Sequence, residues 1–265
     1  MSQPSLADVA RQFAVVFAAI FQVYASYVVG DSVGDLAHKY RSLIFPATYA
    51  FAIWGAIFLL CGVYAIHQAL PIQRDNPVYR AIGWWTAAAF LTNGVWSYAF
   101  INRQFVLAQL IIFAGFVFAG RAFLGFAREA TGARATNVEA WVVGPALGLL
   151  FGWITAANVV GLATTLVALG FAGTGQGAAI GGAALLLLGG AVAFFAILAT
   201  KSGPESAWVA FGAAVLWALV AVIAEQRAAS PLTTGAAILS AVLVAAALVG
   251  PWRAPLQPAG RGAAA

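Results

Sequence analysis

Long apolar stretches, separated by short polar connections, fill almost the whole chain. Each stretch is continuously apolar and close to the roughly 20 residues that a helix needs to cross a bilayer. Strands of a membrane barrel would instead alternate apolar and polar residues over about 10 positions. The pattern therefore predicts an all-α, polytopic helical bundle of about eight transmembrane helices, with seven as the alternative. The expected spans are 11–30, 48–70, 81–101, 104–126, 141–168, 177–199, 206–225 and 232–250.

Composition supports a multi-pass membrane protein. The 265 residues are 63% hydrophobic and 8% charged, with a mean hydropathy of +0.93. A water-soluble domain of this size needs a more polar surface. The net charge of +5 comes from basic residues scattered singly between spans, which excludes nucleic acid as a partner. The lipid bilayer is the expected environment.

Basic residues predict how the bundle lies in the membrane. Lys and Arg are enriched on the cytoplasmic side of such proteins. With eight spans, nine basic residues fall on the side of the termini and four on the other side. The prediction is a bacterial inner-membrane protein with both termini in the cytoplasm. The start of the first span also has features of a signal peptide, but Asp8 weakens that alternative.

Metal-binding patterns are missing from the sequence. There is no HExxH or CxxC motif, and Cys61 is the single cysteine. His38 and His67 are expected near opposite membrane faces, so they do not share a metal. No charged residue is expected in the middle of a span, which argues against a proton-driven transporter. We predict no catalytic residue, no metal and no required cofactor.

Two rows of glycines at a spacing of four predict close helix packing. The first row is Gly144, Gly148 and Gly152, and the second is Gly173, Gly177 and Gly181. Small residues at this spacing let helix backbones approach closely in lipid. The contacts could lie within one chain or between two, so a homodimer is one expectation.

Deep aromatic and amide side chains are the best candidates for a ligand site. Phe51, Trp54 and Phe58 share one helix face by their spacing of three and four. Trp96 and Trp153 lie deep in other spans, whereas Trp84, Trp85, Trp141, Trp208 and Trp252 lie near span ends, where indoles commonly sit. Asn93 and Asn158 need a polar partner in hydrocarbon, which is either another helix or a ligand. The residues alone leave packing and a pocket equally open.

Three motifs resemble the TspO/MBR family of tryptophan-rich sensory proteins, which are related to the translocator protein (peripheral benzodiazepine receptor). In "FPATYAFAIWG", Pro46 precedes Trp54 by eight positions; "TNGVWS" contains Asn93, Trp96 and Ser97; "GWITAAN" places Ala157 four residues after Trp153. Departures are Phe45 and Thr48 in the first motif and the position of Asn158 in the third. Sterol binding is not implied, because residues 159–170 contain no Tyr, Lys or Arg.

The resemblance implies a domain organisation. Residues 1–170 would form the five-helix core of the family, and residues 171–252 a three-helix C-terminal extension similar to that of an extended bacterial branch. Residues 253–265 are expected to be a disordered tail.

The resemblance also implies a pocket for porphyrin-like, haem-like or other flat aromatic ligands and a sensory or regulatory receptor role. Lys39 and Arg41 would form a lid that meets porphyrin propionates, although they could equally be solvated loop charges. Alternative functions are a transporter of a small amphipathic metabolite, an enzyme that degrades porphyrin in light, and a structural role in a complex. The expected ligand-binding residues are Tyr49, Phe51, Trp54, Phe58, Asn93, Trp96, Trp153, Ala157 and Asn158.

Overall fold

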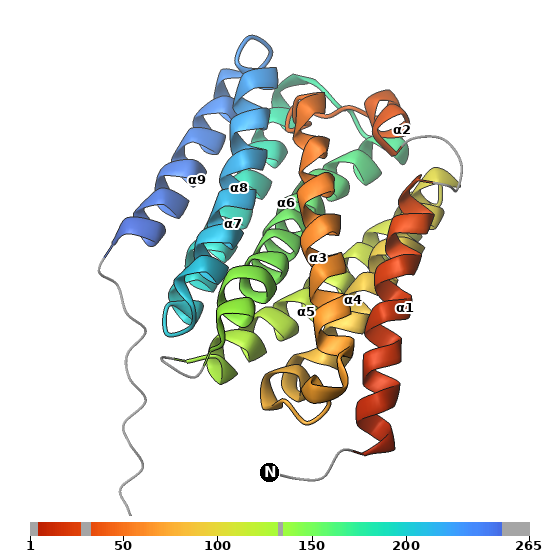
Figure 1. Ribbon diagram of the computed structural model, residues 1–265. Coiled ribbons are helices and arrows are strands. Elements are labelled where there is room, and N and C mark those ends of the chain that lie inside the picture. The colour runs from red at the N-terminus through yellow and green to blue at the C-terminus, as the bar shows by residue number, and fades with distance from the viewer. Residues whose placement is uncertain (1–4, 28–32, 132–134, 251–265) are drawn as a thin grey trace, which may run out of the picture.

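Helices form the whole of the described structure. The computed structural model describes residues 5–27, 33–131 and 135–250, and within these ranges it contains no strand. Figure 1 shows long helices packed side by side in one bundle. The α-helices are α1 (Leu6–Tyr27), α2 (Val33–Lys39), α3 (Ile53–Ala69), α4 (Pro77–Ile101), α5 (Phe105–Glu129), α6 (Gly144–Ala168), α7 (Gly175–Thr200), α8 (Glu205–Gln226) and α9 (Pro231–Val249). The expected tail at 253–265 lies outside the described residues.

Seven helices of the described chain are long and apolar enough to cross a membrane, and α4 is the long helix that is left out. Its 25 residues have the necessary length, but Trp, Tyr, Thr and Asn side chains lower its hydropathy. Because α4 packs between α1 and α5, most of these side chains contact protein and not lipid. The number of spans is eight if α4 is counted and seven if it is not. On either count the chain is a multi-pass membrane protein.

Consecutive helices pack together from α4 to α6, but several of the main contacts join helices that are not consecutive in the chain. Helix α1 packs on α3 and α4, and α5 packs on α4 and α6. Helix α8 then lies between α6 and α9, while α7 packs mainly on α9. The start of α1 and the end of α9 lie at the same end of the bundle, and α2 lies at the other end (Figure 1). We refer to this second end as the α2 end.

Local sequence determines where several helices begin. Asn76 caps α4 by accepting a hydrogen bond from the Val78 N–H, and Pro77 occupies the first helical position, where no N–H is needed. Ser230 and Pro231 play the same two roles at the start of α9. The 3₁₀-helices Thr48–Ala52 and Pro71–Gln73 lead into and out of α3, and a π-helical turn at Glu139–Val143 leads into α6.

The first glycine row joins α6 to α8 within one chain. A Cβ atom on Gly144 would lie 3.1 Å from the Ala207 Cβ, and one on Gly148 would lie 2.9 Å from the Phe211 N. A Cβ on Gly152 would similarly crowd α8 one turn further along. The expected close helix packing is thus confirmed for this row, and its glycines are used inside the chain. The homodimer stays a prediction.

A buried arginine ties α1 to the rest of the bundle. Arg11 is 1% exposed, and its guanidinium donates to the Gln68 side chain at 3.3 Å and to the Arg74 carbonyl at 3.0 Å. Its side chain crosses Gly83 of α4, where a Cβ would lie 2.7 Å from the Arg11 Cδ. One turn earlier, Asp8 accepts two hydrogen bonds from Arg80 of α4, at 2.6 and 2.8 Å. These groups lie in the first turns of α1, so the expectation of no mid-span charge is met there.

Substituting Gly148 by leucine should destabilise the bundle. The new side chain would collide with the α8 backbone, which cannot rotate away, and overpacking of this kind costs on the order of 1–3 kcal/mol. We expect the detergent-solubilised Gly148→Leu protein to melt several degrees below wild type. The matched control is Gly62→Leu on α3, where a Cβ would meet nothing within 4 Å. Equal melting temperatures for the two variants would contradict the assignment.

Candidate functional site

The segment that leads into α3 is held in place by α8. Three hydrogen bonds connect them: the Ala47 N–H donates to the Ala221 carbonyl at 3.0 Å, the Trp217 indole donates to the Ala50 carbonyl at 2.9 Å, and the Gln226 amide donates to the Phe45 carbonyl at 2.8 Å. Pro46 interrupts regular structure here, so the segment needs partners outside its own backbone. Helix α8 supplies them, and α3 then starts at a fixed position.

Two adjoining cavities, which we call the aromatic pocket, lie beside this segment at the α2 end of the bundle. The larger measures about 250 Å³ and is lined by Ser26, Tyr27, Val33, Gly34, Asp35, Thr48, Phe51, Trp54, Phe58, Trp96 and Ser97. The smaller measures about 60 Å³ and is lined by Val33, Ala37, Phe45, Pro46, Phe51, Trp54, Trp96, Phe100, Trp153, Ala156, Ala157, Val160, Gly161, Thr164, Ala218 and Val222. Four residues line both cavities, namely Val33, Phe51, Trp54 and Trp96.

Aromatic rings from different helices meet around the aromatic pocket. Trp153 of α6 is 4% exposed and meets Trp54 edge-on, with ring centroids 6.1 Å apart. It also meets Phe51 edge-on at 5.9 Å. Trp54 stacks on Phe58 at 5.0 Å. These offset and edge-on contacts are the favourable arrangements for aromatic pairs, so the rings support one another and leave faces open to the cavity.

Most of the expected site residues converge on the aromatic pocket. Phe51, Trp54, Phe58, Trp96, Trp153 and Ala157 all line it. Tyr49 does not: it is 46% exposed and packs edge-on against Trp217 on the outside of the bundle. Tyr49 and Phe51 diverge because the chain between them is a 3₁₀-helix.

The two asparagines tie helices together and line neither cavity of the aromatic pocket. The Asn93 amide donates to the Gln22 side chain of α1 at 3.3 Å and is 5% exposed. The Asn158 amide donates to the carbonyls of Ile112 and Ile154 at 3.2 and 3.0 Å, and it accepts from Gln109 at 3.4 Å. Both side chains therefore find their polar partners in neighbouring helices, which was the packing alternative.

The expected cationic lid is placed differently from the prediction. Arg41 forms an ion pair with Glu225 at the end of α8, and its guanidinium lies 5.5 Å from the centre of the Phe45 ring. Lys39 ends α2 and is exposed. Neither residue lines the aromatic pocket, and the Arg41 guanidinium is instead paired with Glu225 of α8.

Hydroxyl groups and one carboxylate provide the polarity of the aromatic pocket. The hydroxyls of Ser26 and Ser97 lie 3.3 Å apart between α1 and α4. The Thr48 hydroxyl lies 2.7 Å from His38 Nε2, and Asp35 lies at the rim. Among the described lining residues there is no Lys, Arg or Glu. The pocket can thus offer hydrogen bonds and ring faces, but it lacks a cation for an anionic group.

The described residues contain no group of three metal-binding side chains. His38 of α2 lies near the start of α3 and His67 lies in its last turn, so the two are well separated, as expected. Each has a neutral partner. His38 is hydrogen-bonded to Thr48, and His67 Nδ1 lies 2.8 Å from the Tyr79 hydroxyl.

Sequence reasoning missed the contribution of α8 to this site. Ala218 and Val222 line the smaller cavity, and Trp217 and Gln226 hold its wall. The sequence did contain a signal for it, because α8 carries Trp217 and Gln226 among apolar residues and both side chains need a polar partner in lipid. Phe45 and Phe100 were also missed, and both line the smaller cavity.

Comparison with known families assigns the chain to one family. The family model described as TSPO-like protein matches residues 8–249. The chain belongs to the TSPO-like protein family. No curated protein and no solved structure matches it. The matched region of this TSPO-like protein runs through α9, so the family model includes the helices beyond residue 170 as well as the five-helix part.

Removing the indole N–H of Trp217 tests the role of α8 in this TSPO-like protein. Trp217→Phe keeps a ring against Tyr49 but removes the indole donor from the Ala50 carbonyl, which still accepts from the Ile53 N–H, so we expect a cost of about 0.5–1.5 kcal/mol. We expect a lower melting temperature and weaker ligand binding. Trp208→Phe is the matched control on α8, because its ring lies beside Lys201, 5.3 Å away, and outside the aromatic pocket. If Trp217→Phe melted and bound like this control, α8 would not be the support of the wall.

Proposed function

We propose that the aromatic pocket binds a flat, uncharged aromatic molecule taken up from the bilayer, and that the protein is a membrane-embedded binding protein with a sensory or regulatory role. The observation that carries this proposal is the convergence of Trp54, Trp96 and Trp153, from α3, α4 and α6, on one cavity. The distribution of basic residues supports placing the α2 end on the outer face of a bacterial inner membrane.

Ring contacts are the expected source of selectivity. An apolar ligand is already dissolved in lipid, so moving it into the protein gains little from the hydrophobic effect. Aromatic pairs add about 0.5–1.5 kcal/mol each beyond simple burial. A ligand that contacts several of the five rings of the larger cavity would therefore be preferred over an aliphatic molecule of equal size.

Position in the bundle favours binding over transport. The larger cavity is lined by the end of α1, the short helix α2, the start of α3 and the end of α4, all at the α2 end. A transporter needs a site near the middle of the membrane that can open to both sides. The larger cavity instead lies at one end of the bundle.

Replacing Trp96 should weaken ligand binding without unfolding the protein. We expect Trp96→Leu to raise the Kd for a flat aromatic ligand by roughly three- to tenfold, because one stacking face is lost. The measurement is quenching of tryptophan fluorescence in nanodiscs, with protoporphyrin IX dimethyl ester as the probe. The control is Trp85→Leu on the same helix, since Trp85 lies 6.2 Å from Phe118 and 5.1 Å from Arg121, away from the pocket. Equal Kd values for the two variants would remove the proposed site.

The charge of the ligand provides a second test. The resemblance to TspO/MBR proteins implies porphyrin-like ligands, whose propionates carry negative charge. Because the described lining contains no cation and includes Asp35, we expect the uncharged dimethyl ester of protoporphyrin IX to bind more tightly than the free acid at pH 7. A tighter free acid would show that Lys39 or Arg41 reaches the ligand, as in the lid hypothesis. Both Kd values are measured by the same fluorescence titration, with the order of the two ligands randomised between experiments.

A further inference from the structure

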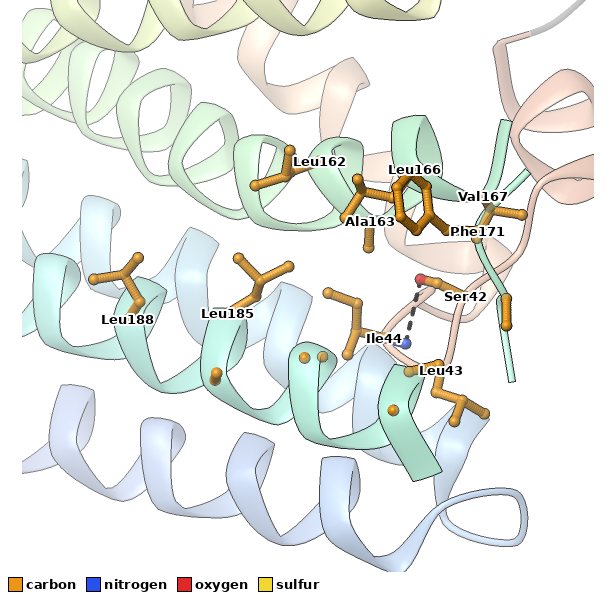
Figure 2. A pocket seen from close by; sticks show the side chains of 16 residues that line it. Ser42, Leu43, Ile44, Leu162, Ala163, Leu166, Val167, Phe171, Leu185 and Leu188 are labelled. Carbon is orange, nitrogen blue, oxygen red and sulfur yellow. Dashed lines mark hydrogen bonds between the residues drawn. The ribbon is translucent and has the colours of Figure 1, made fainter. Parts of the chain in front are cut away.

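A further cavity lies outside the aromatic pocket, in a groove between α6 and α7. It measures about 570 Å³, more than either cavity of the aromatic pocket. Figure 2 shows leucine and valine side chains of α6 above the groove and α7 below it. The irregular segment Ser42, Leu43 and Ile44 closes one end. We call this cavity the lateral groove. No charged residue is among the residues that line it.

Two members of the second glycine row, Gly177 and Gly181, form the floor of the lateral groove. A Cβ on either would meet nothing within 4 Å, in contrast to the first row, whose glycines are covered by α8. The neighbouring Gly182 is covered by Ile44, whose Cγ2 would lie 2.7 Å from a Cβ. Gly177 and Gly181 therefore leave a hollow, whereas the first row joins two helices.

Large apolar side chains form the walls and remain exposed. Leu166 is 37% exposed, Leu188 is 61% exposed and Phe171 is 63% exposed. Because α6 and α7 are membrane spans, this exposed surface faces acyl chains and not water. The lateral groove is a concave, lipid-facing surface.

The length of the lateral groove matches one leaflet of the bilayer. It begins at the α2 end, where α6 ends at Ala168 and α7 begins at Gly175, and its last lining residue on α7 is Leu188. At a rise of about 1.5 Å per residue, Leu188 lies roughly 20 Å along the helix from Gly175. Half of the hydrocarbon core is about 15 Å thick. A single acyl chain descending from the headgroup level would span the groove.

Two basic residues lead into the segment that closes one end of the lateral groove. Lys39 and Arg41 lie three residues and one residue before Ser42, and the Arg41 carbonyl would lie 2.8 Å from a Cβ on Gly173, next to the groove. Arg41 is already paired with Glu225, whereas Lys39 is exposed and has no salt bridge to a described residue. At the α2 end the described charged residues are Asp35, Lys39, Arg41, Arg103, Glu225 and Arg227, an excess of cations.

We propose that the lateral groove is a binding site for an anionic glycerophospholipid. One acyl chain lies on the glycine floor between α6 and α7, and the phosphate lies at Lys39. Charge complementarity identifies the occupant, since a zwitterionic lipid would gain less from an unpaired cation. The site is separate from the aromatic pocket and does not depend on the proposed function.

Filling the floor tests the acyl-chain part of this proposal. Native mass spectrometry of the purified full chain, after equilibration with phosphatidylglycerol, should show one retained lipid per chain for wild type. We expect at least a fivefold loss of the lipid-bound peak for the double variant Gly177→Leu, Gly181→Leu. The control is Gly235→Leu near the start of α9, which is equally open, with nothing within 4 Å of a Cβ, but lies outside the groove. Undiminished lipid in the double variant would overturn the proposal, as would a dimer peak that replaces the lipid-bound peak.

The headgroup part is tested by charge. Lys39→Gln should lower the retained phosphatidylglycerol several-fold, whereas Arg103→Gln, at the same end of the bundle between α4 and α5, should leave it unchanged. Wild type should retain phosphatidylcholine less than phosphatidylglycerol. Equal retention of the two lipids, or equal loss in the two variants, would overturn the assignment of an anionic lipid. Circular dichroism of every variant confirms that the helices are intact.

Discussion

The close approach of α6 and α8 is the contact on which the rest of the site depends. Gly144, Gly148 and Gly152 bring the two helix backbones together at distances that no larger residue allows. Helix α8 then contacts residues 45–50, the segment that leads into α3, and forms three hydrogen bonds with it. Those bonds set the start of α3 and direct Phe51 and Trp54 toward Trp153. The glycine row and the aromatic pocket are therefore parts of one arrangement.

Polar side chains inside the spans serve mainly to hold helices together. Hydrocarbon offers no partner to an amide or guanidinium, so each such group must be satisfied within the protein. Asn93 bonds to Gln22, Asn158 to α5, and Arg11 to Gln68 and a backbone carbonyl. Since these groups are used in this way, the polarity left for a ligand comes from small hydroxyls and Asp35. The ligand that we propose is therefore one with little charge.

The sequence predicted the helices and the convergence of the indoles well, but it predicted the facing of individual residues poorly. Length and hydropathy determine spans, and the motif spacings correctly grouped Phe51, Trp54 and Phe58 on one face. Facing is harder because lipid is as apolar as a protein core, so core-facing and lipid-facing sides of these helices have the same composition. Two examples show this. Tyr49 points outward from a 3₁₀-helix, and Gly177 and Gly181 of the second row are open, whereas the first row, of identical spacing, is buried. Only the packing of α8, which is distant in sequence, distinguishes them.

The segment from Ser42 to Pro46 lies between the lateral groove and the aromatic pocket. Ser42, Leu43 and Ile44 line the lateral groove, whereas Phe45 and Pro46 line the aromatic pocket. This segment and α6 contribute residues to both, so a molecule in one could affect the other by moving either element. Two hydrogen bonds to α8, at the Phe45 carbonyl and the Ala47 N–H, oppose such movement, and Ile44 is wedged against Gly182. The wall is thus fixed from both sides, which favours a pocket that exists before the ligand arrives, so little of the binding free energy is spent on ordering the protein.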